Sequence, residues 1–176
     1  LACADSRPIR LRSVSSVFAS PPPRRVWLKT TEEPPRHVLD VNRFLREQLE
    51  RHGRRVGLIV DLCNHDCLYQ EDLERSDCDV RYAHVRLVAK EVPDEATVTR
   101  FAEVIDAFRR ERPEDFVAVH CAYGFNRTGF MLSSYLIRHR GLAIGEAMEL
   151  FSKARSPGIK HEKFKRALQA RYGEGE

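Results

Sequence analysis

Residues 116–136, "FVAVHCAYGFNRTGFMLSSYL", constrain the fold more than any other part of this chain. The segment begins with a short, β-rich apolar run, passes through a short loop, and continues as a second apolar run. The first run is typical of a buried strand. The second run is apolar on nearly all sides, which predicts a helix at the centre of the domain. The cysteine and the arginine of the loop therefore lie between two buried elements.

The rest of the chain alternates between strand and helix patterns. Residues 55–62 and the alternating residues 80–88 predict two more strands. Helices are predicted from Asp40 to Gly53, after residue 95, and over residues 143–154 and 160–172. The first helix should bury the apolar residues that share one face, Val41, Phe44, Leu45 and Leu49. We therefore predict an α/β domain with a central mixed or parallel sheet flanked by helices.

Length and composition indicate one globular domain behind a basic arm. The chain has 176 residues and no window of 18 apolar residues, so we expect no membrane span. Residues 1–24 are rich in Pro, Ser and Arg, and we expect the domain to cover 25–174. Residues 1–30 hold six basic residues and one acidic residue, so the arm is either simply solvated or attracts a polyanion such as RNA. The start lacks Met and a sustained apolar core, which indicates a fragment boundary rather than a signal peptide.

The five cysteines do not predict a disulfide framework. Their number is odd and their spacing irregular, which favours a reducing compartment. Two of them, Cys63 and Cys67, enclose "NHD" on one short loop. Adjacent groups on so short a loop rarely reach one ion together, so we expect no metal site.

Residues 120–128 form the pattern H-C-x-x-G-x-x-R-T, in which each fixed position suits the binding of an oxyanion. Cys121 ends a strand and faces the start of a helix, where amides and the helix dipole favour a thiolate. Gly124 allows a tight turn, and Arg127 offers a planar fork to two phosphate oxygens. Thr128 places a hydroxyl near the sulfur. We expect His120 to hold the loop backbone rather than act as a base.

The remaining positions of this predicted phosphate-binding loop are Ala122, Tyr123, Phe125 and Asn126. Their backbone amides can point inward around an anion. The Tyr123 and Phe125 rings either line the rim or pack into the core. A nucleotide-binding Walker loop is excluded, because Phe130 and Met131 stand where Lys and Ser or Thr would be required.

The loop pattern is the signature of cysteine-dependent phosphatases. "VHCAYGFNRTGF" together with "FSKARSPGIKHEKFKRALQARYG" resembles the RNA 5′-triphosphatase domain of bifunctional mRNA capping enzymes. "VWLKT" and "VDLCN" also look like that family, and the resemblance covers roughly residues 24–174.

The resemblance implies a dual-specificity-like phosphatase fold and a hydrolase of the 5′-triphosphate end of RNA. The γ-phosphate of nascent RNA would be removed through a phosphocysteine intermediate, without a metal or other cofactor, as the first step of capping. It further implies a nuclear location and a guanylyltransferase domain C-terminal to this fragment.

The general acid is the least defined part of the predicted site. By resemblance, the acid loop lies about thirty residues before the cysteine, where Asp94 is the first candidate. Glu91, Glu95 and Asp61 are the alternatives, and the reaction needs little acid because RNA diphosphate is a good leaving group. Asp94 or Glu95 could instead cap the helix that follows.

Two further basic residues are candidates for substrate binding, and two other functions compete with the one that the resemblance implies. Arg155 and Lys160 flank "SPGI" and could contact the α- and β-phosphates, or be ordinary exposed charges. The chain could also be a dual-specificity protein phosphatase, or an RNA phosphatase outside the capping pathway. A non-catalytic phosphate-binding domain is disfavoured, because Cys121 and Arg127 are both intact.

Overall fold

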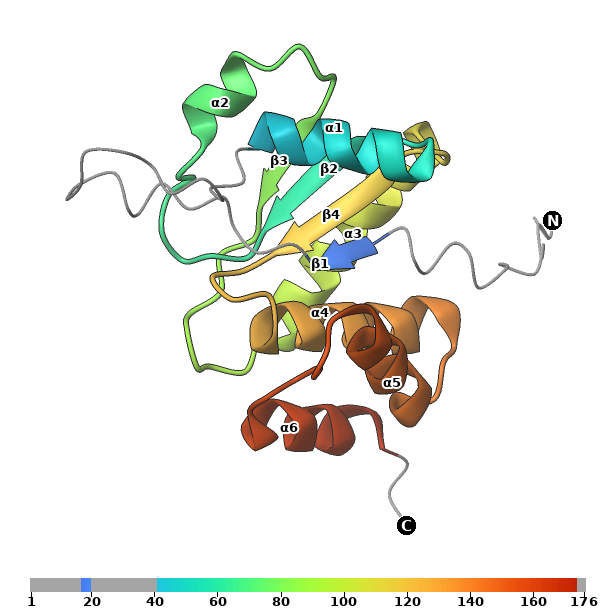
Figure 1. The fold of residues 1–176 in the computed structure, drawn as a ribbon. Coiled ribbons are helices and arrows are strands. Elements are labelled where there is room, and N and C mark those ends of the chain that lie inside the picture. The colour runs from blue at the N-terminus through green and yellow to red at the C-terminus, as the bar shows by residue number, and fades with distance from the viewer. Residues whose placement is uncertain (1–16, 20–40, 174–176) are drawn as a thin grey trace, which may run out of the picture.

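A four-stranded parallel sheet forms the centre of the computed structural model, which describes residues 17–19 and 41–173 (Figure 1). The strand order is β1-β4-β2-β3, and each neighbouring pair is parallel. The strands are β1 (Val17–Ala19), β2 (Val56–Asp61), β3 (Arg81–His84) and β4 (Phe116–His120). Because parallel strands end at the same edge of a sheet, the loops that follow β2, β3 and β4 meet there.

Helices cover both faces of this sheet, which confirms the predicted α/β class. In Figure 1, α1 and α2 lie on one side of the sheet, and α3 to α6 lie on the other. The helices are α1 (Val41–His52), α2 (Gln70–Glu74), α3 (Glu95–Glu111), α4 (Asn126–Arg140), α5 (Ile144–Ala154) and α6 (Glu162–Tyr172). Every residue of β2 and β4 is buried, as expected for strands covered on both faces.

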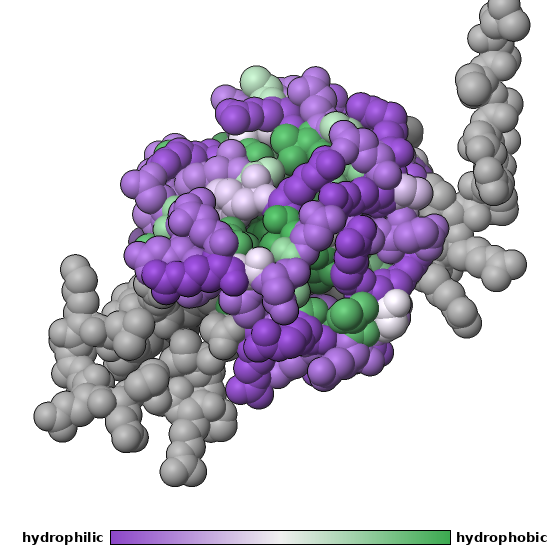
Figure 2. Space-filling model, turned by 90° about the horizontal axis from the view of Figure 1, so that it is seen from above, coloured by the Kyte–Doolittle hydropathy of each residue, from purple (hydrophilic) through white to green (hydrophobic). Residues whose placement is uncertain are grey.

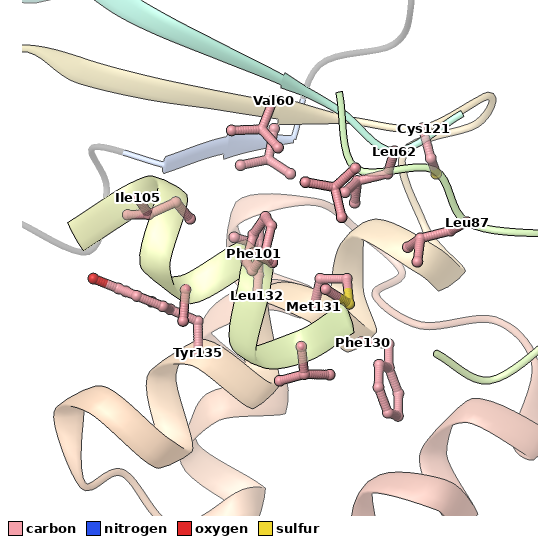
Figure 3. Packing of buried hydrophobic residues seen from close by; sticks show 14 of the residues in the cluster. Val60, Leu62, Leu87, Phe101, Ile105, Cys121, Phe130, Met131, Leu132 and Tyr135 are labelled. Atoms are coloured by element: carbon pink, nitrogen blue, oxygen red, sulfur yellow. The ribbon is translucent and has the colours of Figure 1, made fainter. Parts of the chain in front are cut away.

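The main core lies between the sheet and α3 to α6. Side chains alternate across a strand, so Val117 and Val119 of β4 face this core while Ala118 faces the opposite one. Figure 3 shows Phe101 and Ile105 of α3 beside Met131 and Leu132 of α4, under the end of β2. This cluster also contains Cys121, so the cysteine is anchored to the largest packed region of the domain.

The smaller core lies under α1 and α2. Val41 and Leu45 pack there, but the expected burial of Leu49 is wrong, because that side chain is 49% exposed and Gln48 is buried instead. Positions 41, 45 and 48 form the face of α1 that meets the sheet, and Leu49 lies beside it. Seen from this side, hydrophilic residues cover most of the surface and hydrophobic ones show between them (Figure 2).

The predicted central helix is confirmed as α4, which is buried continuously from Thr128 to Leu136 and contacts α3, α5 and α6. The strand predicted over residues 80–88 is shorter than expected, since β3 ends at His84. Its alternation nevertheless continues, with Val85 and Leu87 buried.

The predicted basic arm is described only in part. Val17–Ala19 lie within the range assigned to the arm and pair with β4 as an edge strand. The rest of residues 1–24, the segment "RVWLKT" and Asp40 lie outside the described residues. In the part of the chain that the structure describes, no helix combines the length and apolarity needed to cross a bilayer.

Gly129 allows α4 to approach its neighbours closely. A Cβ atom at this position would lie 2.5 Å from both Ile159 Cγ1 and Phe151 Cε1. We therefore expect Gly129→Ala to lower the free energy of unfolding by about 1–3 kcal/mol through overpacking. Chemical denaturation measures this change. Gly145→Ala on α5 is the matched control, because a Cβ atom added there would meet no neighbouring atom within 4 Å. This substitution should raise the free energy of unfolding by about 0.5 kcal/mol. Equal effects of the two substitutions would contradict the packing argument.

Candidate active site

The loop between β4 and α4 wraps around the Cys121 sulfur. Cys121 directly follows β4, whose last residue His120 pairs in register with Asp61 of β2. Gly124 has φ 72°, in the left-handed region that favours glycine, and this turns the chain back toward the sulfur. The Gly124 amide donates a hydrogen bond to Cys121 Sγ at 3.3 Å. The loop backbone therefore presents a donor to its own cysteine before any ligand binds.

The surroundings of Cys121 favour the thiolate. Burial alone would raise its pKa, because the sulfur is removed from water. The Thr128 hydroxyl, the amides of Thr128 and Tyr123, and the Arg127 charge act in the opposite direction. Together they outweigh burial, so the pKa of Cys121 is lowered. The Thr128 hydroxyl is buried and lacks any partner of ordinary hydrogen-bond geometry, which leaves it free to turn toward the sulfur. A buried cysteine of lowered pKa in the loop before a helix has the character of a nucleophile.

Arg127 lies in the first turn of α4, with its guanidinium held by two neighbouring loops. Its Nη1 donates to the carbonyl oxygens of Leu62 at 3.2 Å and Leu87 at 3.0 Å. These carbonyls follow β2 and β3, so the sheet edge itself positions the arginine. A guanidinium has five N–H donors, and anchoring through one nitrogen leaves others for an oxyanion.

His120 supports the loop from behind. Its ring is buried, with Nε2 2.5 Å from the Tyr69 hydroxyl and Nδ1 3.7 Å from Asp61 Oδ1. Burial lowers the pKa of His120, although Asp61 acts in the opposite direction. A neutral, enclosed imidazole is placed to orient the end of β4 rather than to take a proton from a substrate.

Asp61, Cys63 and His120 form a buried group of potential metal ligands, with donor atoms within 4.8 Å of one another. Asp61 already accepts hydrogen bonds from the Cys63 amide at 2.8 Å and the Tyr82 hydroxyl at 3.1 Å. Burial raises the pKa of the Cys63 thiol well above its usual value, which opposes a metal-binding thiolate. These contacts fit a hydrogen-bonded support behind the loop. Nothing in the sequence near Cys63 indicates this grouping, since His120 comes from a distant strand.

Asp94 caps α3. Its Oδ1 accepts a hydrogen bond from the Thr97 amide at 2.8 Å, so the capping interpretation is confirmed. The Thr97 contacts and Arg171 lower the pKa of Asp94, which disfavours proton donation near neutral pH. The general-acid role of Asp94 stays a prediction.

The loop that carries the acid candidates is attached to α6. Lys163 Nζ donates to the Lys90 carbonyl at 3.3 Å, and Arg171 Nη2 donates to the Pro93 carbonyl at 2.8 Å. Glu95 forms ion pairs with Arg138 and Arg171, whereas Glu91 is exposed. Of the other acid candidates, the Asp61 side chain is buried, and the Glu95 carboxylate is held in ion pairs with two arginines.

Arg155 and Lys160 both lie against the Phe125 ring of the loop, with cation-to-centroid distances of 4.7 Å and 3.9 Å. Arg155 Nη2 also donates to the Tyr123 carbonyl at 3.4 Å. The Asn126 side chain accepts from the amides of Lys160 at 2.9 Å and His161 at 2.8 Å. The connection between α5 and α6 is therefore clasped to the loop, and both predicted cations stand beside it.

The two loop aromatics have different environments. Phe125 is half-buried and carries the two cations, while Tyr123 is 72% exposed at the rim. Together, residues 121–128 combine a cysteine of lowered pKa, amides that act on its sulfur, and the charge of Arg127. This arrangement suits nucleophilic displacement at a tetrahedral oxyanion such as a phosphoryl group.

Comparisons with known proteins agree with this arrangement. The family "Dual specificity phosphatase, catalytic domain" matches residues 46–173. An mRNA-capping enzyme of Danio rerio is 33% identical over 79% of this chain, which spans 24% of that protein's length. A human RNA/RNP complex-1-interacting phosphatase is 33% identical over 74% of this chain, which spans 38% of it.

Solved structures show the same fold. Human DUSP28 has a TM-score of 0.61 at 20% identity, covering 90% of this chain and 91% of that one. Tk-PTP in its active form has a TM-score of 0.59 at 19% identity, covering 76% of this chain and 86% of that one. The fold, the cysteine loop and the family match agree, and the chain belongs to the dual specificity phosphatase catalytic domain family.

Proposed function

We propose that this domain is a polynucleotide 5′-triphosphatase that removes the γ-phosphate of nascent RNA. The observation that carries the proposal is the pair of cations, Arg155 and Lys160, held on Phe125 beside the cysteine loop. One phosphate cradle covers one phosphoryl group, and a triphosphate end brings two more. We expect the two cations to compensate these additional negative charges.

The proposed reaction has two displacements. The Cys121 thiolate attacks the γ-phosphorus in line, the bond from the γ-phosphorus to the bridging oxygen breaks, and RNA diphosphate leaves. Water then attacks the phosphocysteine, which releases inorganic phosphate and restores the thiolate. In both steps Arg127 and the loop amides hold the three equatorial oxygens, over which the negative charge is spread in the transition state.

Three features make the reaction feasible without a metal or another cofactor. Arg127 supplies the positive charge that a metal ion would otherwise provide at the transferred phosphoryl group. Arg155 and Lys160 supply it at the inner phosphates. RNA diphosphate is a good leaving group, so proton donation by Asp94 or another acid contributes little. The lowered pKa of Cys121 increases the fraction of the nucleophilic thiolate.

We place this reaction at the first step of mRNA 5′ capping, in the nucleus. The support comes from the capping-enzyme relatives, of which this chain spans only about a quarter of the length. A guanylyltransferase domain C-terminal to this segment, which would use the diphosphate end, is part of the same proposal.

A second candidate is a dual-specificity protein phosphatase, or an RNA phosphatase outside the capping pathway. The specific observation in its favour is that the human RNA/RNP complex-1-interacting phosphatase is as similar as the capping enzyme, at 33% identity. The family matched by residues 46–173 is also named for dual specificity.

Substrate choice separates the two candidates. We expect fast γ-phosphate release from 5′-triphosphate RNA in excess chelator, and at least tenfold slower release from a phosphotyrosine peptide. In the same assay, Arg155→Ala should slow RNA turnover about 10-fold or more while sparing a small aryl phosphate. Lys153→Ala, which removes an exposed cation paired with Glu149, is the matched control. Preference for the peptide, or strict metal dependence, contradicts the proposal.

The Thr128 hydroxyl should set the acid limb of the pH profile. The thiolate is present above the pKa of Cys121 and is lost as pH falls through it. Because Thr128 helps to lower that pKa, Thr128→Ala should raise it and move the acid limb of kcat/KM to higher pH. Thr128→Ser keeps the hydroxyl and should keep the wild-type limb. An unchanged limb in Thr128→Ala would show that the hydroxyl does not stabilise the thiolate.

A further inference from the structure

Tyr123 has an unusual position for an exposed aromatic side chain. It is 72% exposed, the most of any large hydrophobic residue in the described part of the chain, yet it lies between the buried Cys121 and Gly124. A single exposed hydrophobic residue is ordinary on a protein surface. The significance of Tyr123 therefore depends on what surrounds it.

The backbone of Tyr123 is fixed relative to the nucleophile. Its carbonyl accepts a hydrogen bond from Arg155 Nη2 at 3.4 Å, and the next amide, that of Gly124, donates to the Cys121 sulfur at 3.3 Å. The base of the side chain is thus held on both sides while the ring itself projects into solvent. A flat ring on a fixed base is pre-organised for a ligand, because little ordering remains to be done on binding.

Arg155 lies between Tyr123 and the proposed binding site of the inner phosphates. The same guanidinium that bonds the Tyr123 carbonyl also lies 4.7 Å from the centre of the Phe125 ring, next to Lys160. If these two cations accept the inner phosphates, the nucleoside attached to the α-phosphate leaves the loop along the rim that carries Tyr123.

We propose that the Tyr123 ring stacks on the first nucleobase of 5′-triphosphate RNA. The inference rests on the proposed triphosphatase function and adds a contact to the nucleoside. Within the described residues, no aromatic side chain or cation occupies the Tyr123 ring. Stacking tolerates any base, because every base has a π-face, so Tyr123 should favour a nucleoside over bare phosphate without selecting its identity.

Three triphosphate substrates test this contact: a short 5′-triphosphate RNA, the same RNA with an abasic first nucleotide, and inorganic tripolyphosphate. We expect Tyr123→Ala to lower kcat/KM on the first substrate about fivefold or more relative to its effect on the other two. Tyr123→Phe keeps the ring and should keep the wild-type ratio of kcat/KM between the RNA and the two substrates without a first base. Leu49→Ala, which removes an exposed hydrophobic side chain from α1, is the matched control and should change none.

The outcomes that overturn the inference are separate from those that overturn the function. Equal losses on all three substrates in Tyr123→Ala would mean that Tyr123 shapes the loop, and no loss would mean that it does not contact the base. Either result contradicts stacking while the wild-type protein still hydrolyses the RNA. Absence of γ-phosphate release by the wild-type protein overturns the proposed function, and the stacking contact with it.

Discussion

Stabilisation of a buried thiolate is the physical requirement on which this site depends. Burial of Cys121 in the main core opposes ionisation, so charge on the sulfur requires compensation within the loop itself. The Gly124 amide, the Thr128 hydroxyl and the Arg127 charge supply it. The same groups suit the oxygens of a transferred phosphoryl group, and a loop that binds its own thiolate is therefore already shaped for an anion.

The fold holds this loop from three directions. Behind it, the register of β2 and β4 brings Asp61 beside His120. Each of these two side chains forms hydrogen bonds with other residues near the end of β4. The carbonyls that follow β2 and β3 fix Arg127, and the connection from α5 to α6 is attached in front through Asn126. Each contact comes from a different segment, so the loop depends on β2, on the segment after β3 and on the connection between α5 and α6.

Much of the fold could be predicted because its signals are local. The strand-loop-helix unit and the apolar α4 follow from periodicity, and the structure shows them. Leu49 was misplaced because periodicity gives the spacing of a face but not which neighbouring row meets the sheet. The end of β3 was misjudged because alternation continues through Val85 and Leu87 after ladder pairing has stopped.

The parts of the site that the sequence could not supply depend on contacts between distant segments. Nothing near Arg127 in the chain indicates the carbonyls of Leu62 and Leu87, and nothing near Phe125 indicates Arg155 and Lys160 as its partners. Asp94 shows the opposite case, because capping is a local contact and was one of the two interpretations available from the sequence.

Formation of a phosphocysteine tests most directly whether the Cys121 thiolate is the nucleophile that attacks the γ-phosphate. The wild-type protein is mixed with RNA labelled in the γ-phosphate, quenched within one turnover, and digested for peptide analysis. The mechanism predicts label on the peptide that contains Cys121, its loss in Cys121→Ser, and no label when the β-phosphate is marked instead. Release of γ-phosphate by Cys121→Ser at the wild-type rate, with no labelled peptide in either protein, would contradict it.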